Sequence, residues 1–182
     1  LLQAQTPNYY RNPDRIYLDS KEGHNGNFTW QMYKAGDVKE AAEKVSQPGY
    51  QTQQWMPAIV PGTVLNSLVY NKVYPEPYYG MNNHIDEKII PDLAHAGRDF
   101  YTYWFRTEFD IPESYKDKVV WLQVDGINYR AEIWVNGFLL GNMSGMFKED
   151  YIDITDFARI GKKNALAIKV YPVDVPGTIM PK

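Results

Sequence analysis

The chain has 182 residues, a net charge of −3, no cysteine, and 15% aromatic residues that include 15 Tyr and 5 Trp. The lack of cysteine excludes a disulfide framework and thiolate zinc sites, and the aromatic content excludes a disordered chain. The nearly balanced charge gives no reason to expect nucleic acid or an anionic membrane as a partner. No segment reaches the roughly 20 apolar residues of a membrane span, and the length suits a single domain.

The first 27 residues are polar and rich in turn-forming residues, which predicts an irregular extension ahead of a domain at 28–182. Phe28, Trp30 and Met32 then alternate with Thr, Gln and Tyr, which predicts a first strand. The first five residues lack the charged start and the apolar stretch of a signal peptide. The compartment therefore stays open at this point.

Two short helices are expected before residue 71. Asp37 and Glu40 have the spacing of a capping box, and the apolar residues after Asp37 share one helical face, so a helix is predicted up to Pro48-Gly49. Thr63 is placed to cap a second short helix that runs through Tyr70. Between the two, residues 55–60 predict an edge strand, because the proline at position 57 removes a backbone donor.

Residues 71–98 form a long stretch rich in Pro, Gly and Asn, too apolar for disorder, which predicts an ordered surface loop with a short helical turn. Tyr78, Tyr79, Asn82 and Asn83 lie on it. Aromatic faces suit the C–H faces of a sugar ring, and polar side chains can bond its hydroxyls. The alternative is that the rings fix the loop to the domain or fill an interface with another domain.

From residue 100 onward, apolar and polar residues alternate in short runs, the pattern of half-buried strands. Asn136-Gly137 predicts a two-residue hairpin, because both central residues of a type I′ turn need a positive φ. The pattern predicts at least six strands, and therefore an all-β antiparallel sandwich or barrel with few helices. The runs fall at 101–109, 119–124, 131–135, 138–140, 152–154 and 166–170.

Two tryptophans on these runs lie on the more polar strand faces. Trp104 shares its face with Arg106, and Trp134 shares its face with Glu132 and Asn136. A large aromatic residue in this setting indicates a covered surface, for which a contact with another domain is one explanation and ordinary amphipathic exposure the other. With the neighbouring Arg130, these residues are candidates for a substrate rim or an interdomain contact.

Motifs for the common chemistries are absent. The sequence contains no glycine-rich phosphate motif and no Gly-x-Ser-x-Gly elbow. The three histidines (His24, His84 and His95) are scattered, and the three aspartates that could supply oxygens to calcium (Asp150, Asp153 and Asp156) lack the Gly and distal Glu of an EF-hand loop. We expect no catalytic residue, no metal and no cofactor in this chain.

Several fragments follow one another in a specific order. Read together, they resemble the N-terminal domain of glycoside hydrolase family 2, in the branch of β-mannosidases, endo-β-mannosidases and exo-β-glucosaminidases, over about residues 28–176. One departure is Glu76, where this branch commonly has Asp. The fragments are VPGTVL at 60–65, PYYGMN at 77–82, FYTYWFR at 100–106, GINYRAEIWVNG at 126–137, DIT at 153–155 and NALAIKV at 164–170.

The resemblance implies a jelly-roll β-sandwich called the sugar-binding domain, which precedes an immunoglobulin-like domain and a TIM barrel. It also implies that the two catalytic Glu residues of a retaining β-glycosidase lie in the barrel, and that a Trp-rich segment able to touch substrate lies beyond Lys182. No catalytic residue is carried over to this chain. The 77–83 loop is the part expected to approach the active-site rim.

Family enzymes are several times longer, so we expect this chain to be a segment of a larger enzyme whose partner is carbohydrate. Export to the periplasm or the exterior is favoured for a parent that degrades polysaccharides. Two other hypotheses remain open at this stage: a stand-alone carbohydrate-binding module, which shares the sandwich fold and uses exposed aromatic residues, and a protein-interaction domain with no sugar role.

Overall fold

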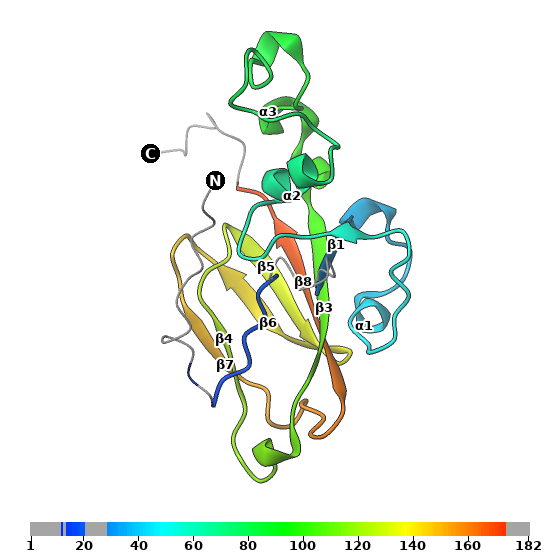
Figure 1. The fold of residues 1–182 in the computed structure, drawn as a ribbon, viewed down its shortest axis with the longest axis vertical. Helices are drawn as coiled ribbons and strands as arrows, with labels where there is room; N and C mark the ends of the chain where they lie inside the picture. Colours follow the sequence, from blue (N-terminus) through cyan, green and yellow to red (C-terminus); the bar gives the residue numbers. More distant parts are fainter. Residues whose placement is uncertain (1–11, 13, 21–28, 174–182) are drawn as a thin grey trace, which may run out of the picture.

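The computed structural model describes residues 12, 14–20 and 29–173, so most of the predicted extension, Phe28 and the last nine residues lie outside it. Six strands of the described chain form one antiparallel sheet in the order β2-β1-β3-β8-β5-β6, and two form a small sheet, β4-β7 (Figure 1). The predicted all-β sandwich is confirmed. The strands are β1 (Trp30–Lys34), β2 (Met56–Pro57), β3 (Tyr103–Asp110), β4 (Trp121–Val124), β5 (Arg130–Val135), β6 (Phe138–Ser144), β7 (Asp150–Asp153) and β8 (Lys163–Tyr171).

The helices are short. The second predicted helix is confirmed, because the Thr63 hydroxyl accepts a hydrogen bond from the Asn66 amide at 3.0 Å at its start. The described helical elements include one more α-helix than the two expected. They are the α-helices α1 (Ala42–Val45), α2 (Val64–Tyr70) and α3 (Leu93–Ala96) and the 3₁₀-helices η2 (Ala35–Asp37), η3 (Ile85–Glu87), η4 (Arg98–Tyr101) and η5 (Glu113–Tyr115).

The predicted helix start at Asp37 is wrong. Asp37 ends the 3₁₀-helix η2, and Ala41 is still extended, so α1 begins only at the next residue. The capping box does not form, and Glu40 instead accepts a hydrogen bond from the Tyr50 hydroxyl at 3.2 Å. A tertiary contact therefore overrides the local signal.

The predicted hairpin is confirmed. Asn136 and Gly137 have φ angles of 52° and 95°, and Val135 pairs with Phe138 across the turn. The return strand β6 runs further than expected, to Ser144. The edge strand around Pro57 is confirmed in shortened form as β2, the first strand of the large sheet.

The main hydrophobic core lies where the small sheet packs against one face of the large sheet. Met32, Phe105 and Ile133 of the large sheet and Leu122 and Ile154 of the β4–β7 region are all buried in one cluster. Burial of each such side chain stabilises the fold by about 1.5–3 kcal/mol. This is the core that the alternating sequence pattern predicts.

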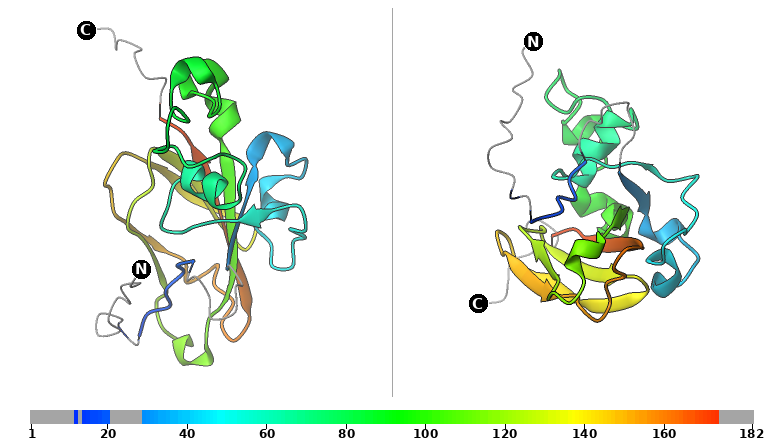
Figure 2. Two further views of the ribbon diagram at one scale, coloured as in Figure 1. Left: turned by 45° about the horizontal axis from the view of Figure 1, so that its top comes forward. Right: turned by 60° about the horizontal axis from the view of Figure 1, so that its bottom comes forward.

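The large sheet is also covered on its other face. Trp104, Trp134 and Ala167 form a second buried cluster with Val45 and Trp55, which lie in the segment 38–55 between β1 and β2. In Figures 1 and 2 this segment, with α1, lies beside β1 and β3. We call it the cover segment. The small sheet and the cover segment thus bury opposite faces of one sheet.

A buried arginine holds the cover segment in place. Arg106, which is 4% exposed, donates from Nε to the Val45 carbonyl oxygen at 2.9 Å and from Nη2 to that of Gln47 at 2.7 Å. The same Nη2 donates to Glu108 Oε1 at 2.5 Å. Gly137 of the hairpin lies so close that a Cβ there would sit 2.0 Å from Gln47 Nε2. The Gln47 amide is the end of a flexible side chain that can move aside, so it is the φ angle of 95° that requires glycine here.

Glu108 makes the stability of the fold depend on pH in the acidic range. Its partial burial opposes ionisation, but hydrogen bonds from Arg106 and from the Gly49 amide outweigh this and hold the pKa of Glu108 below its ordinary value of 4.5. A carboxyl group whose pKa is lowered by folding adds stability above its unfolded-state pKa and loses it as the pH falls through its folded-state pKa.

We therefore expect the free energy of unfolding to fall as the pH drops below 4.5, the ordinary pKa of this group, and to fall less in Glu108→Gln. Urea denaturation at a series of pH values from neutral to acidic measures both proteins. An identical acid dependence in the two would contradict the assignment.

Candidate functional site

Residues 71–98 form a lobe that stands out at one end of the molecule, between α2 and β3 (Figures 1 and 2). The ordered loop with short helical turns is confirmed, because η3 and α3 lie within it. Tyr74 packs against the main core, and the Tyr101 hydroxyl donates to the Pro91 carbonyl oxygen at the base of the lobe. Burial is the main cause that raises the pKa of Tyr101 to about 12, so its hydroxyl keeps the proton that it donates.

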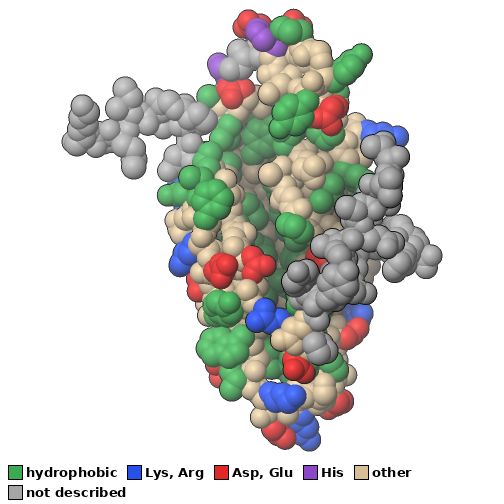
Figure 3. Space-filling view, turned by 60° about the vertical axis from the view of Figure 1, so that its left-hand side comes forward, with side chains coloured by type: hydrophobic (Ala, Val, Ile, Leu, Met, Phe, Trp, Pro, Cys, Tyr) green, Lys and Arg blue, Asp and Glu red, His purple; other side chains and the backbone are tan. Residues whose placement is uncertain are grey.

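Two tyrosines of this lobe are strongly exposed. Tyr78 is 94% exposed and Tyr79 is 77% exposed. The turn beneath them is fixed, because the Glu76 carbonyl oxygen accepts from the Tyr79 amide at 3.2 Å and from Asn82 Nδ2 at 2.9 Å. Figure 3 shows hydrophobic side chains at the surface of the lobe, beside the histidines at its top. A held turn thus presents two aromatic rings to the outside.

Two of the other candidates lie on the same lobe, and Arg130 lies on the large sheet. Asn83 is exposed on the lobe, whereas Asn82 is used to hold the turn. Arg130 begins β5, with its guanidinium carbon 5.9 Å from the centre of the Tyr129 ring. The seven sequence candidates therefore do not converge on one site.

Trp104 and Trp134 differ most from the expectation. They are only 4% and 8% exposed, because the cover segment of the same chain lies over them. The sequence analysis predicted a covered surface from the polar strand faces on which these rings lie, and the surface is covered. The covering segment, however, belongs to the same chain. This corrects the expected rim or interdomain contact at these two rings, which leave almost no surface for a sugar or another domain.

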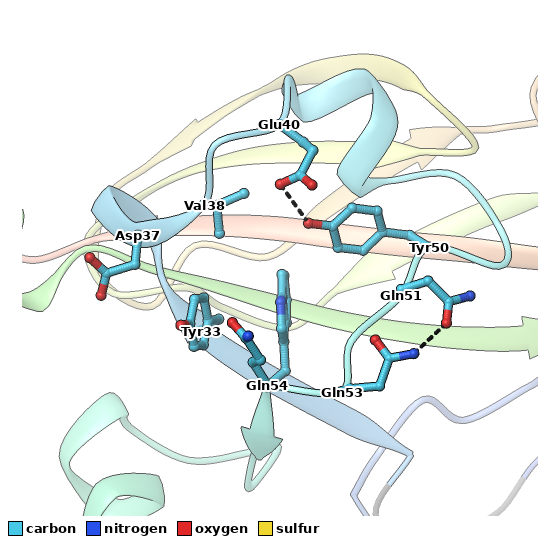
Figure 4. A pocket seen from close by; sticks show the side chains of 9 residues that line it. Tyr33, Asp37, Val38, Glu40, Tyr50, Gln51, Gln53 and Gln54 are labelled. Carbon is cyan, nitrogen blue, oxygen red and sulfur yellow. Dashed lines mark hydrogen bonds between the residues drawn. The ribbon is translucent and has the colours of Figure 1, made fainter.

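The sequence analysis missed a pocket of about 300 Å³ formed by β1 and residues 37–55 (Figure 4). The Trp55 ring lies between two tyrosine rings, with its centre 5.9 Å from each: the Tyr33 ring is nearly parallel at 16° and the Tyr50 ring is tilted by 73°. The feature of the sequence that could have indicated this pocket is the glutamine-rich stretch just before Trp55. The remaining lining residues are Asp37, Val38, Glu40, Gln51, Gln53 and Gln54.

The family model described as "Glycosyl hydrolase 2 galactose-binding domain-like" matches residues 30–176. The chain belongs to this family. It is 42% identical to a mannosylglycoprotein endo-beta-mannosidase of Lilium longiflorum over 74% of this chain, and 31% identical to an exo-beta-D-glucosaminidase of Hypocrea jecorina over 86% of it. The resemblance stated from the ordered fragments is confirmed, and it favours a hydrolase domain over a stand-alone module.

Solved structures agree. The crystal structure of Amycolatopsis orientalis exo-chitosanase CsxA matches 80% of this chain with a TM-score of 0.66 and 28% identity. The chain covers 16% of that protein, 14% of the lily enzyme and 17% of the Hypocrea enzyme. This glycosyl hydrolase 2 domain thus corresponds to a small part of each of them.

The family fragments occupy distinct places in this glycosyl hydrolase 2 domain. VPGTVL leads into α2, PYYGMN lies within the lobe, and FYTYWFR runs into β3. Within residues 12, 14–20 and 29–173, no group of three or more His, Asp or Glu side chains is placed to hold a metal ion. Asp153, one of the three aspartates considered for calcium, accepts hydrogen bonds from the Thr155 amide and hydroxyl. No helix in these residues is both long and apolar enough to cross a membrane.

Proposed function

We propose that this chain is the non-catalytic sugar-binding-type domain of a larger retaining β-glycosidase that acts on β-linked mannose or glucosamine units. The observation that carries the proposal is the family match over residues 30–176, because it covers nearly the whole described domain. The names of the relatives, endo-beta-mannosidase and exo-beta-D-glucosaminidase, supply the substrate class.

In the proposed parent enzyme the chemistry is carried out by another domain. Retaining glycosidases use two carboxyl groups about 5–5.5 Å apart, one as the nucleophile that forms a glycosyl–enzyme intermediate and one as the acid and then the base. The partners of this chain are an immunoglobulin-like domain and a TIM barrel of the same polypeptide. The two-sided burial of the large sheet makes the chain a rigid support for them.

The turn of the lobe that carries Tyr78 and Tyr79 is the proposed contact with the barrel. Tyr78 and Tyr79 expose most of their surface, whereas tyrosine rings are enriched in buried contacts between proteins. Their turn is already ordered by the bonds to Glu76, so a contact there orders few additional groups. We place this turn against the rim of the active site.

The expected result of replacing both Tyr78 and Tyr79 with alanine in the full-length parent is a fall in kcat/KM of about five- to thirtyfold, from loss of about 1–2 kcal/mol of contact. The melting temperature of the 182-residue chain should stay unchanged, because neither ring packs in its core. Steady-state kinetics and thermal unfolding measure the two effects.

The matched control is Tyr151→Ala, which removes a ring that is 53% exposed on β7, in the small sheet. This variant should keep the kcat/KM of the parent. Unchanged kcat/KM in the Tyr78/Tyr79 double variant would refute the rim contact.

A further inference from the structure

The pocket beside Trp55 is built before any ligand arrives. Trp55 is 8% exposed, and its contacts with the rings of Tyr33 and Tyr50 fix the direction in which both rings face. The Tyr50 ring also lies 5.7 Å from the guanidinium carbon of Arg106, which is itself held by the cover segment. A ligand that touches these rings therefore has little side-chain motion to suppress.

Amide groups surround the rings. Gln53 Nε2 donates to Gln51 Oε1 at 2.5 Å (Figure 4). Gln51 Nε2 donates to the Gly49 carbonyl oxygen at 3.0 Å. The Gln54 amide has no hydrogen-bond partner within the described residues, and Figure 4 shows it beside Tyr33. An amide offers both a donor and an acceptor, which matches a pair of neighbouring hydroxyl groups.

The charge of the pocket is one-sided. Its nine lining residues, all in the described chain, carry the carboxylates of Asp37 and Glu40 and no Lys, Arg or His. Burial and the hydrogen bond to Glu40 raise the pKa of Tyr50, so this hydroxyl remains a donor. Such a lining repels uronic acids and phosphates and accepts hydroxyl or ammonium groups.

We propose that this pocket binds a single pyranose residue of a neutral or amino-bearing saccharide, with Tyr33 and Tyr50 in contact with the ring and Gln54 bonded to its hydroxyls. Its volume of about 300 Å³ is at the lower end for small-molecule sites, which fits one sugar ring better than a long oligosaccharide. The site deepens the proposed function, on which its sugar class rests, and its lining comes from this chain and involves neither the lobe nor a catalytic domain.

The test is a titration of the 182-residue chain with β-1,4-mannobiose, with the β-1,4-linked dimer of glucosamine and with glucuronate, followed by amide chemical shifts. We expect saturable binding of the first two with Kd in the millimolar range and at least about fivefold weaker binding of glucuronate. Shifts should centre on residues 33, 50 and 54. No saturable binding of either disaccharide, or glucuronate binding of equal strength, would overturn the proposal.

Variants separate the pocket from the rest of the surface. Tyr33→Ala should abolish binding, and Gln54→Ala, which changes an exposed side chain and leaves the fold intact, should weaken it at least fivefold. Tyr151→Ala is the matched control for the ring and should bind as the parent chain does. Unaltered binding in Gln54→Ala and in Tyr33→Ala would place the sugar elsewhere and overturn the proposal. Because the lobe is untouched, loss of the rim contact through Tyr78 and Tyr79 would leave this result unchanged.

Discussion

Replacing Asn164 with alanine is expected to lower the free energy of unfolding by about 3 kcal/mol. Asn164 is fully buried, and its side chain joins three parts of the chain. Its Nδ2 donates to the carbonyl oxygens of Arg159 and Lys162 at 2.9 and 2.8 Å. Its Oδ1 accepts from the Arg159 amide at 2.8 Å and from Asn136 Nδ2 at 2.7 Å.

The loss is large because alanine removes one partner from each of four hydrogen bonds and leaves the other partners without water. An unsatisfied buried polar group costs about 1–3 kcal/mol, and some relaxation reduces the sum. Asn136 is 1% exposed and receives the Ala165 amide at 2.9 Å on its Oδ1, so the hairpin and the start of β8 are loosened together.

Asn142→Ala is the matched control, because Asn142 is exposed on β6 of the same hairpin. We expect its effect on the free energy of unfolding to stay within about 0.5 kcal/mol. Urea denaturation with matched m-values measures both variants. A loss below about 1 kcal/mol in Asn164→Ala would show that the network contributes no more than one ordinary hydrogen bond.

The second large effect is expected for Arg106→Met, at about 2–4 kcal/mol. Methionine fills much of the arginine volume but leaves the Val45 and Gln47 carbonyl oxygens and the Glu108 carboxylate without their donor. Glu108 keeps 23% of its side-chain surface exposed, which is why the estimate lies below that for a fully buried ion pair. The cover segment should then detach more easily from the large sheet.

Limited proteolysis together with urea denaturation tests this expectation, with new cleavage expected between residues 38 and 55. Arg159→Met is the control, because Arg159 is exposed and donates to the side chain of the same Gln47 at 3.1 Å. It should change stability by less than about 1 kcal/mol. Equal protection of the cover segment in Arg106→Met and the parent would contradict its anchoring by this arginine.

Local rules predicted the parts of the fold that depend on a few adjacent residues. The Asn136-Gly137 turn, the Thr63 cap and the edge position of Pro57 each follow from φ angles or hydrogen-bond donors within one or two residues, and all three are confirmed. The helix start at Asp37 failed because Glu40 finds its partner ten residues away, in Tyr50. No window of local pattern contains that contact.

The sites show the same division. The exposed tyrosines of the lobe were found because a long aromatic loop stands out in composition. The covering of Trp104 could not be predicted from local pattern, because the residues that cover it, Val45 and Trp55, lie about 50 residues or more away in the chain. The pocket was missed for the same reason, since Tyr33 reaches Trp55 only after β1 pairs with β2.

The two edges of the large sheet differ in their risk of aggregation. At one edge, β2 is two residues long and contains Pro57, which cannot donate to an added strand. At the other edge, β6 has seven residues, begins with the exposed Phe138 and Leu139, and pairs within the described chain with β5 alone. Of these two edges, β6 is therefore the one open to strand addition between copies of this chain. Replacing Leu139 with a charged residue should oppose this pairing and keep concentrated samples monomeric.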